Sequence, residues 1–203
     1  MKSSFALRLA LLAATALPAL AQNGKPDPEG FLRDWLVLAP LPIEADTAAN
    51  EIDILQFPTE AQPDARADAT QKVSPTRTLT WTKTAATEFY LDFAKLYPRQ
   101  SENVIAWAVA YVVSAEEKTG LTLLMNSNDQ GKAYLNGKEL VKFTDTRVLD
   151  KNTEDSAANV TLKKGVNIVV LKVINQENNW QGSLRFLDAA GKPVTALEVR
   201  TAP

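Results

Sequence analysis

The chain has 203 residues with 22 basic and 24 acidic side chains, a formal net charge of −2, and neither histidine nor cysteine. This near-balance of charge argues against a nucleic-acid partner, because phosphate binding needs a concentrated basic surface. The lack of histidine excludes Ser-His-Asp and Cys-His catalysis and imidazole metal sites. The lack of cysteine excludes disulfides, thiol chemistry and thiolate metal sites, so the fold must be held by its core.

Residues 1–21 have the pattern of a secretory signal peptide. Two basic residues flank the start of an apolar stretch that ends at Leu20, and Ala19-Leu20-Ala21 fits the small-x-small rule for cleavage before Gln22. The stretch is shorter than the about 20 residues that a spanning helix needs, and an uncleaved anchor is the alternative. We predict a periplasmic or secreted protein that has no membrane contact after cleavage.

The mature chain is long enough for one domain. Residues 22–30 are polar with two prolines and predict a flexible leader. Residues 31–203 predict a single β-sandwich domain. Within it, residues 44–74 are rich in Ala, Asp, Thr and Pro and predict a long irregular excursion over the surface, a type of loop that is often functional or disordered.

Short strands separated by polar turns fill the rest of the chain. Residues 104–113 are almost all apolar and predict a central strand buried on both faces. For residues 88–97 a strand is favoured over a helix, although the apolar spacing fits both. The other predicted strands are residues 35–38, 77–83, 121–125, 132–135, 138–141, 161–162, 166–174, 183–187 and 194–199. This number of short strands predicts an all-β, two-sheet antiparallel β-sandwich or jelly roll.

Two turns are defined by their residues. Asn136-Gly137 accepts positive φ at both central positions, as a type I′ hairpin between residues 132–135 and 138–141 requires. Lys163-Lys164-Gly165 predicts a second strand-turn-strand unit between residues 161–162 and 166–174.

Five short sequence motifs follow one another along the chain. They are Trp35–Leu41, Asn126–Asp129, Ala133–Gly137, Leu162–Asn167, and Lys172-Val173 followed by Trp180. In this order they resemble the galactose-binding-like, carbohydrate-binding-module-like jelly-roll domains of exported bacterial proteins. The resemblance implies a jelly-roll sandwich that is non-catalytic and often binds carbohydrate. The chain departs from the pattern at Ala39, Asn126 and Val166, and Asn128 replaces an aspartate and removes one carboxylate.

The candidate carbohydrate site combines an aromatic ring with amides. Trp180 follows a run of amides and a carboxylate, so it is the best candidate for stacking on a sugar, and the alternative is a tryptophan that caps the end of the sandwich. Trp35, Trp81 and Trp107 lie in apolar strands and predict core packing. The predicted ligand-binding residues are Trp180, Asn179, Asn178, Glu177, Tyr134 and Asn136, with strand packing the alternative for Tyr134.

An oxygen-rich turn, Asn126, Asn128 and Asp129, is the weak candidate for a metal site. Calcium prefers carboxylate and carbonyl oxygens, but this turn offers one carboxylate, so Asp145 or Asp150 would have to converge on it. The alternative is an Asx-type turn that satisfies its own backbone. Beyond a possible calcium ion, we predict no cofactor.

Three functions follow in order of preference. The first is an exported, non-catalytic module that binds carbohydrate. The second is a structural or assembly module that binds a protein partner through residues 44–74. The third is a glycoside hydrolase that uses a pair of the acids Glu116, Glu117, Asp150, Glu154, Asp155 and Glu177.

Overall fold

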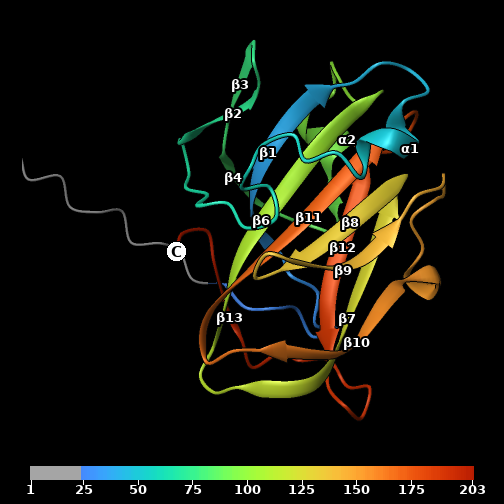
Figure 1. The fold of residues 1–203 in the computed structure, drawn as a ribbon. Helices are drawn as coiled ribbons and strands as arrows, with labels where there is room; N and C mark the ends of the chain where they lie inside the picture. Colours follow the sequence, from blue (N-terminus) through green and yellow to red (C-terminus); the bar gives the residue numbers. More distant parts are fainter. Residues whose placement is uncertain (1–23) are drawn as a thin grey trace, which may run out of the picture.

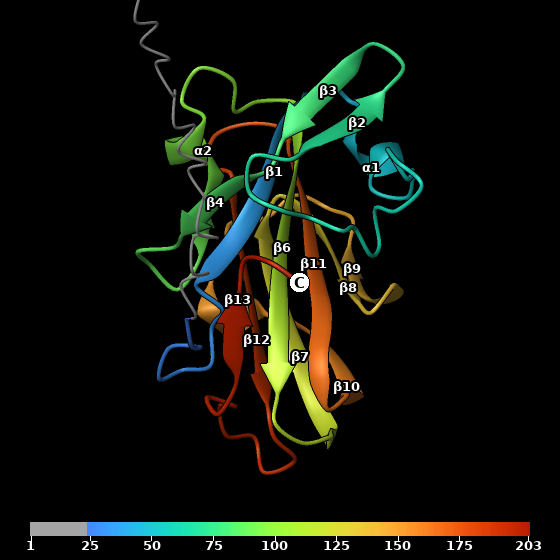
Figure 2. The same cartoon turned by 90° about the vertical axis from the view of Figure 1, so that its left-hand side faces the viewer.

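A computed structural model describes residues 24–203 as an antiparallel β-sandwich, which confirms the predicted fold class (Figures 1 and 2). The predicted signal peptide lies outside these residues. The seven-stranded sheet has the order β4 (Thr82–Ala85), β1 (Asp34–Pro42), β6 (Val104–Ser114), β11 (Gly165–Asn175), β8 (Gln130–Leu135) and β9 (Lys138–Phe143), and β13 (Glu198–Arg200) also pairs with β6. The four-stranded sheet has the order β10 (Asp155–Leu162), β7 (Lys118–Asn128), β12 (Gln181–Leu187) and β5 (Leu91–Asp92).

The remaining elements are short. A two-stranded ribbon consists of β2 (Thr70–Ser74) and β3 (Arg77–Thr80). The helices are α1 (Ala48–Glu51), α2 (Phe93–Leu96) and the 3₁₀ turn Lys151–Thr153. No helix within residues 24–203 is both long and apolar enough to cross a bilayer.

The centre of the seven-stranded sheet is buried on both faces, as predicted for residues 104–113. Successive side chains of β6 alternate between two apolar cores, with Ala106 and Ala108 in the inner core between the sheets and Trp107 in an outer core. β6 and β11 pair in register over eleven consecutive residue pairs, from Ser114–Gly165 to Val104–Asn175. This ladder is the structural centre of the molecule.

The outer core is closed by the segment of residues 44–74, which corrects the prediction of an excursion over the surface. Its apolar side chains Ile52, Phe57 and Ala65 are buried against the outer face of the seven-stranded sheet. Phe57 meets Trp107 edge to face with ring centroids 5.4 Å apart. The segment is therefore mostly irregular in backbone but forms a third layer of the fold.

A buried ion pair fixes this layer to the sheet. Lys172 lies on the outer face of β11, and its Nζ is 3.1 Å from Oε1 of Glu60, both side chains being fully buried. The same Nζ donates to the carbonyl oxygens of Glu51 at 2.9 Å and Ile54 at 2.7 Å. Burial lowers the pKa of Lys172, and the Glu60 carboxylate opposes this shift. The pair costs desolvation but specifies where the segment docks.

A second, more exposed group of charges continues from this pair. Lys132 of β8 is the β-ladder neighbour of Lys172 of β11. Its Nζ lies 2.7 Å from Asp53 and 3.2 Å from Glu139. Lys142 also contacts Asp53, at 2.9 Å. Hydrogen bonds from the two lysines lower the pKa of Asp53 to about 2. The residues around α1 are thus tied to β8 and β9 by charge.

The Asn136-Gly137 turn has the predicted positive φ at both positions, 51° and 83°, and joins β8 to β9. The Asn136 side chain is occupied within the fold: its Oδ1 accepts from the Ile168 amide at 2.9 Å, and its Nδ2 donates to Asn167 at 2.9 Å. The turn therefore also anchors β11.

Two local predictions are wrong and one is confirmed. Residues 24–30 are not a flexible leader, because Gly24 exchanges two backbone hydrogen bonds with Val199. Residues 88–97 contain only the short strand β5 and then α2, whose first turn is capped by Asp92. The strand-turn-strand unit predicted around Lys163-Lys164-Gly165 is confirmed, because β10 ends at Leu162 and β11 begins at Gly165. The two strands belong to different sheets, since β10 pairs with β7 whereas β11 pairs with β6 and β8.

Candidate functional site

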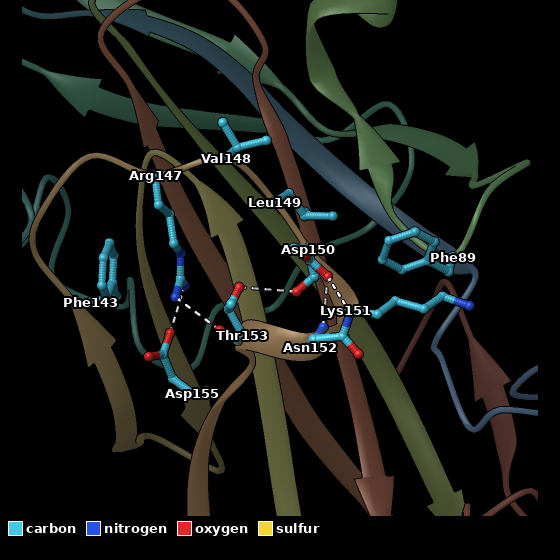
Figure 3. Close-up of a pocket in the computed structure, with 10 residues that line it drawn as sticks. All are labelled: Phe89, Phe143, Arg147, Val148, Leu149, Asp150, Lys151, Asn152, Thr153 and Asp155. Atoms are coloured by element: carbon cyan, nitrogen blue, oxygen red, sulfur yellow. Dashed lines mark hydrogen bonds and ion pairs between the residues drawn. The ribbon is translucent and has the colours of Figure 1, made fainter.

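Two surface depressions flank one loop, residues 144–153, that follows β9. The first, which we call the amide cleft, has a volume of about 720 Å³ and brings together Asn128, Asp129, Glu177, Asn178 and Asn179. The second, which we call the aromatic cleft, has a volume of about 860 Å³ and lies on Phe89, Phe143 and Leu149 (Figure 3). Arg147 and Val148 line both depressions.

The amide cleft forms where loops of the two sheets meet. Asn128 and Asp129 join β7 to β8, whereas Glu177, Asn178 and Asn179 follow β11. The Asp129 carboxylate accepts a hydrogen bond from the backbone N–H of Gln176 at 3.0 Å, which ties the two connections together. Glu177, Asn178 and Asn179 are exposed, and Asn178 has a positive φ of 65°. Three predicted ligand residues and two predicted metal residues therefore share one depression.

Arg147 fixes the loop between the two clefts. Its guanidinium donates to the Ser127 carbonyl at 2.9 Å and to the Ser127 hydroxyl at 3.0 Å, and it pairs with Asp155 at 2.6 Å. It also stacks 3.8 Å from the centre of the Phe143 ring. These contacts hold the loop in one shape and leave the neighbouring Val148 74% exposed on the rim.

The aromatic cleft is bounded by rings and by a capped 3₁₀ turn. In Figure 3, Phe143 and Phe89 lie on either side of the loop residues. Phe89 is half-buried and packs on Phe31 and Tyr90 with centroid distances of 5.2 and 5.0 Å. Lys151 crosses it with Nζ 4.7 Å from the ring centre. The Asp150 side chain accepts from the Asn152 amide at 2.8 Å and so caps the turn.

Trp180 is not an exposed stacking platform. Its accessible fraction is 0%, and its ring packs on Phe93 and Tyr97 with centroid distances of 5.2 and 6.2 Å. An indole with no accessible face cannot stack on a sugar ring, so the predicted contact is corrected in favour of the alternative, a tryptophan that closes the end of the core. Trp35, Trp81 and Trp107 are buried, as predicted.

Tyr134 and Asn136 lie away from the amide cleft. Tyr134 is buried in the outer core, and burial raises the pKa of its hydroxyl well above the ordinary value, with Glu60 nearby adding to the shift. Asn136 has the structural role in its turn described above. Neither side chain lines either cleft.

The Asn126–Asp129 turn is organised by its own hydrogen bonds. Asn126 is buried, accepts from the Ser127 amide and donates to the carbonyl of Asp150. Asp150 therefore lies next to the turn, as the calcium hypothesis requires. It contacts the turn through its backbone carbonyl, whereas its carboxylate accepts from the Asn152 backbone amide. Within residues 24–203, no three acidic, histidine or cysteine side chains gather in a way that could hold a metal ion.

The acids considered for hydrolysis are mostly engaged elsewhere. Asp155 pairs with Arg147, Glu154 binds Arg185 at 3.0 Å, and Glu116 pairs with Lys118 at 3.0 Å. Asp150 caps its turn. These contacts use the carboxylates to hold the chain, and only Glu177 faces the amide cleft as an exposed acid.

The lining residues that the sequence analysis does not predict include Phe89, Phe143, Arg147 and Val148. The aliphatic pair Val148-Leu149 in an otherwise polar stretch is a usable signal, because no strand pattern places these residues in the core. The two phenylalanines gave none, since each lies in an apolar pattern that is typical of strands.

Comparison with known proteins gives only distant structural likenesses. No family model and no curated protein matches the chain. It is similar to the PA14 sugar-binding domain of an RTX adhesin, with a TM-score of 0.42 and 8% identity over 82% of this chain and 96% of that one. It is also similar to the PA14 domain of the antifreeze protein MpAFP, with a TM-score of 0.41 and 9% identity over 94% and 97%. A GH31 α-xylosidase from Xanthomonas citri gives 0.35 and 12% over 90% of this chain and 19% of the enzyme.

Proposed function

We propose that this protein is an exported, non-catalytic module of the galactose-binding-like jelly-roll type that binds carbohydrate in the amide cleft. The observation that carries the proposal is the convergence of Asn128 and Asp129 with Glu177, Asn178 and Asn179 from a separate connection. Amides donate and accept hydrogen bonds and carboxylates accept them, so together they match the hydroxyls of a sugar. The exposed Val148 adds an apolar contact for the C–H face of the ring.

The geometry favours binding over hydrolysis. A hydrolase needs two carboxyl groups facing each other across the scissile bond. In the described residues that line the aromatic cleft, Asp150 and Asp155 are engaged by Asn152 and Arg147. A protein partner on residues 44–74 is less favoured, because the buried apolar side chains of that segment pack against the sheet. Among its described large apolar residues, the neighbouring pair Ile54 and Leu55 is exposed.

The test is a glycan array probed with the purified protein from Gln22 to Pro203, with and without calcium. The variant Glu177→Ala/Asn178→Gly removes two exposed side chains, and glycine retains the positive φ at position 178. We expect the double variant to lose about tenfold or more in affinity, since each lost hydrogen bond to a polar group is worth about 1 kcal/mol.

Glu116→Ala is the matched control, because Glu116 is exposed, forms an ion pair with Lys118 and lies outside both clefts. A blank array across plant, microbial and host glycans overturns the proposal. Binding that survives the double variant overturns the location. Binding that requires calcium makes the Asn126–Asp129 turn a candidate ion site again.

A further inference from the structure

The amide and aromatic clefts are neighbours with a common rim. Arg147 and Val148 belong to the lining of both. Side-chain contacts fix the position of this rim, since Arg147 binds Ser127 and Asp155 and stacks on Phe143. A ligand longer than one sugar unit that leaves the amide cleft on this side therefore passes over Val148 into the aromatic cleft.

The aromatic cleft has the composition of a sugar subsite. Phe89 offers an accessible part of its ring, which is held in place by Phe31 and Tyr90. Asn152 is exposed in the same lining. Its Nδ2 donates to Asp150 at 2.9 Å, and its amide oxygen supplies an acceptor. An apolar ring next to a small number of polar groups is the usual composition of a site for a ligand with both apolar and hydroxyl faces.

Charge narrows the ligand class. Within residues 24–203, the two cations that line the clefts, Arg147 and Lys151, are already paired with Asp155 at 2.6 Å and with Glu29 at 2.7 Å. The other charged side chains in the linings, Asp129, Asp150 and Glu177, are carboxylates. An anionic sugar would meet like charge here without a free cation to offset it.

We infer that the aromatic cleft is a second subsite of the same binding face, and that the ligand is an uncharged oligosaccharide long enough to cross Val148 and reach Phe89. This inference rests on the proposed function, because it extends the amide cleft. It predicts that affinity rises with chain length until the aromatic cleft is filled and then stays constant.

The experiment measures binding of immobilised oligosaccharides of glucose, mannose, galactose and xylose, from one to six units, against oligogalacturonates of the same lengths. In Phe89→Leu, which retains apolar packing but removes the ring, we expect the affinity for the longest neutral chain that binds to fall about tenfold toward that of the shortest. The affinity for the shortest sugars stays unchanged. Leu96→Ser, an exposed apolar residue outside both clefts, is the control.

Each result has one meaning, provided that the thermal midpoint of Phe89→Leu shows it is folded. Length-independent binding that still depends on Glu177 and Asn178 overturns the second subsite and leaves the proposed function standing. Equal loss for short and long chains in Phe89→Leu also overturns the second subsite. Preference for oligogalacturonates overturns the uncharged class, and absence of binding to every sugar overturns the proposed function itself.

Discussion

The inner face of the seven-stranded sheet is covered by a second sheet, whereas its outer face is covered by the irregular segment 44–74. The inner core is built from apolar side chains of both sheets, whereas the outer layer is also fixed by a buried ion pair, Lys172 and Glu60. The regular alternation of side chains along the strands positions the two sheets against each other. An irregular segment has no such repeating pattern to fix its position on a sheet. The difference indicates that charge specifies the docking of a segment that backbone periodicity cannot place.

Tryptophans on the two faces provide a matched pair for this comparison. Trp180→Ala in the inner core and Trp107→Ala in the outer core each remove a fully buried indole. We expect each to lower the free energy of unfolding by about 3–5 kcal/mol, measured by urea denaturation. A loss below about 2 kcal/mol for Trp107→Ala alone would mean that segment 44–74 collapses or detaches at little cost, and the outer layer would be the weaker one.

The ion pair itself is tested by removing one partner. Lys172→Met leaves the Glu60 carboxylate buried without its cation, and we expect a loss of about 3 kcal/mol, at the low end for such pairs because the Gln56 amide still binds the other carboxylate oxygen. Lys172→Met/Glu60→Leu restores most of this loss, since neither charge is then buried. If the double variant is no more stable than Lys172→Met, the loss does not come from leaving the Glu60 carboxylate buried without its cation.

The hairpin turn tests how far the outer layer extends. A Cβ on Gly137 would lie 2.8 Å from the Gln62 side chain of segment 44–74, and φ there is 83°. Gly191 has φ of 74° and no neighbour within 4 Å, so Gly191→Ala measures the conformational cost alone, about 1–2 kcal/mol. We expect Gly137→Ala to lose slightly more stability than Gly191→Ala by urea denaturation. Equal losses would show that Gln62 moves aside freely.

The smallest effect concerns the exposed ion pairs of Asp53. Its pKa is lowered in the folded state from the ordinary 3.8 to about 2, so the stabilisation is present above about pH 4 and is lost as the pH falls to about 2. At neutral pH, Asp53→Asn should cost less than about 1 kcal/mol, because the carboxylate is largely exposed. The difference between the variant and the wild type should shrink as the pH falls from about 4 through about 2 in acid titrations of the unfolding free energy. A difference that does not change over this range contradicts a charge-based origin.

The sequence predicted what depends on local pattern. The apolar run of β6 and the Asn136-Gly137 turn each contain the information for their own geometry, and both were found. Segment 44–74 was not placed, because Ile52, Phe57 and Ala65 have no regular spacing and their burial depends on a sheet formed by distant residues. The prediction of an exposed Trp180 was wrong for the same reason, because the rings of Phe93 and Tyr97 that cover it come from a different part of the chain.

The candidate site was predicted only in part. The polar runs at residues 126–129 and 175–179 are each visible in the sequence, but their meeting in one cleft follows from the pairing of β7 with β12 and of β11 with β8. Phe89 cannot be assigned from the sequence, because it contributes to the aromatic cleft only through the position of its loop in the folded chain, whereas Val148 stands out only as an aliphatic residue in a polar stretch.

The unbroken ladder between β6 and β11 has a consequence for how the molecule opens. Its eleven residue pairs contain no bulge, and both of its faces are covered, one by the four-stranded sheet and one by segment 44–74. Amide hydrogens here can exchange with deuterium only when the whole domain unfolds, whereas those of residues 144–153 exchange through local fluctuations. The exchange rate of the β6 amides therefore reports the global unfolding free energy site by site, in the native protein and without denaturant.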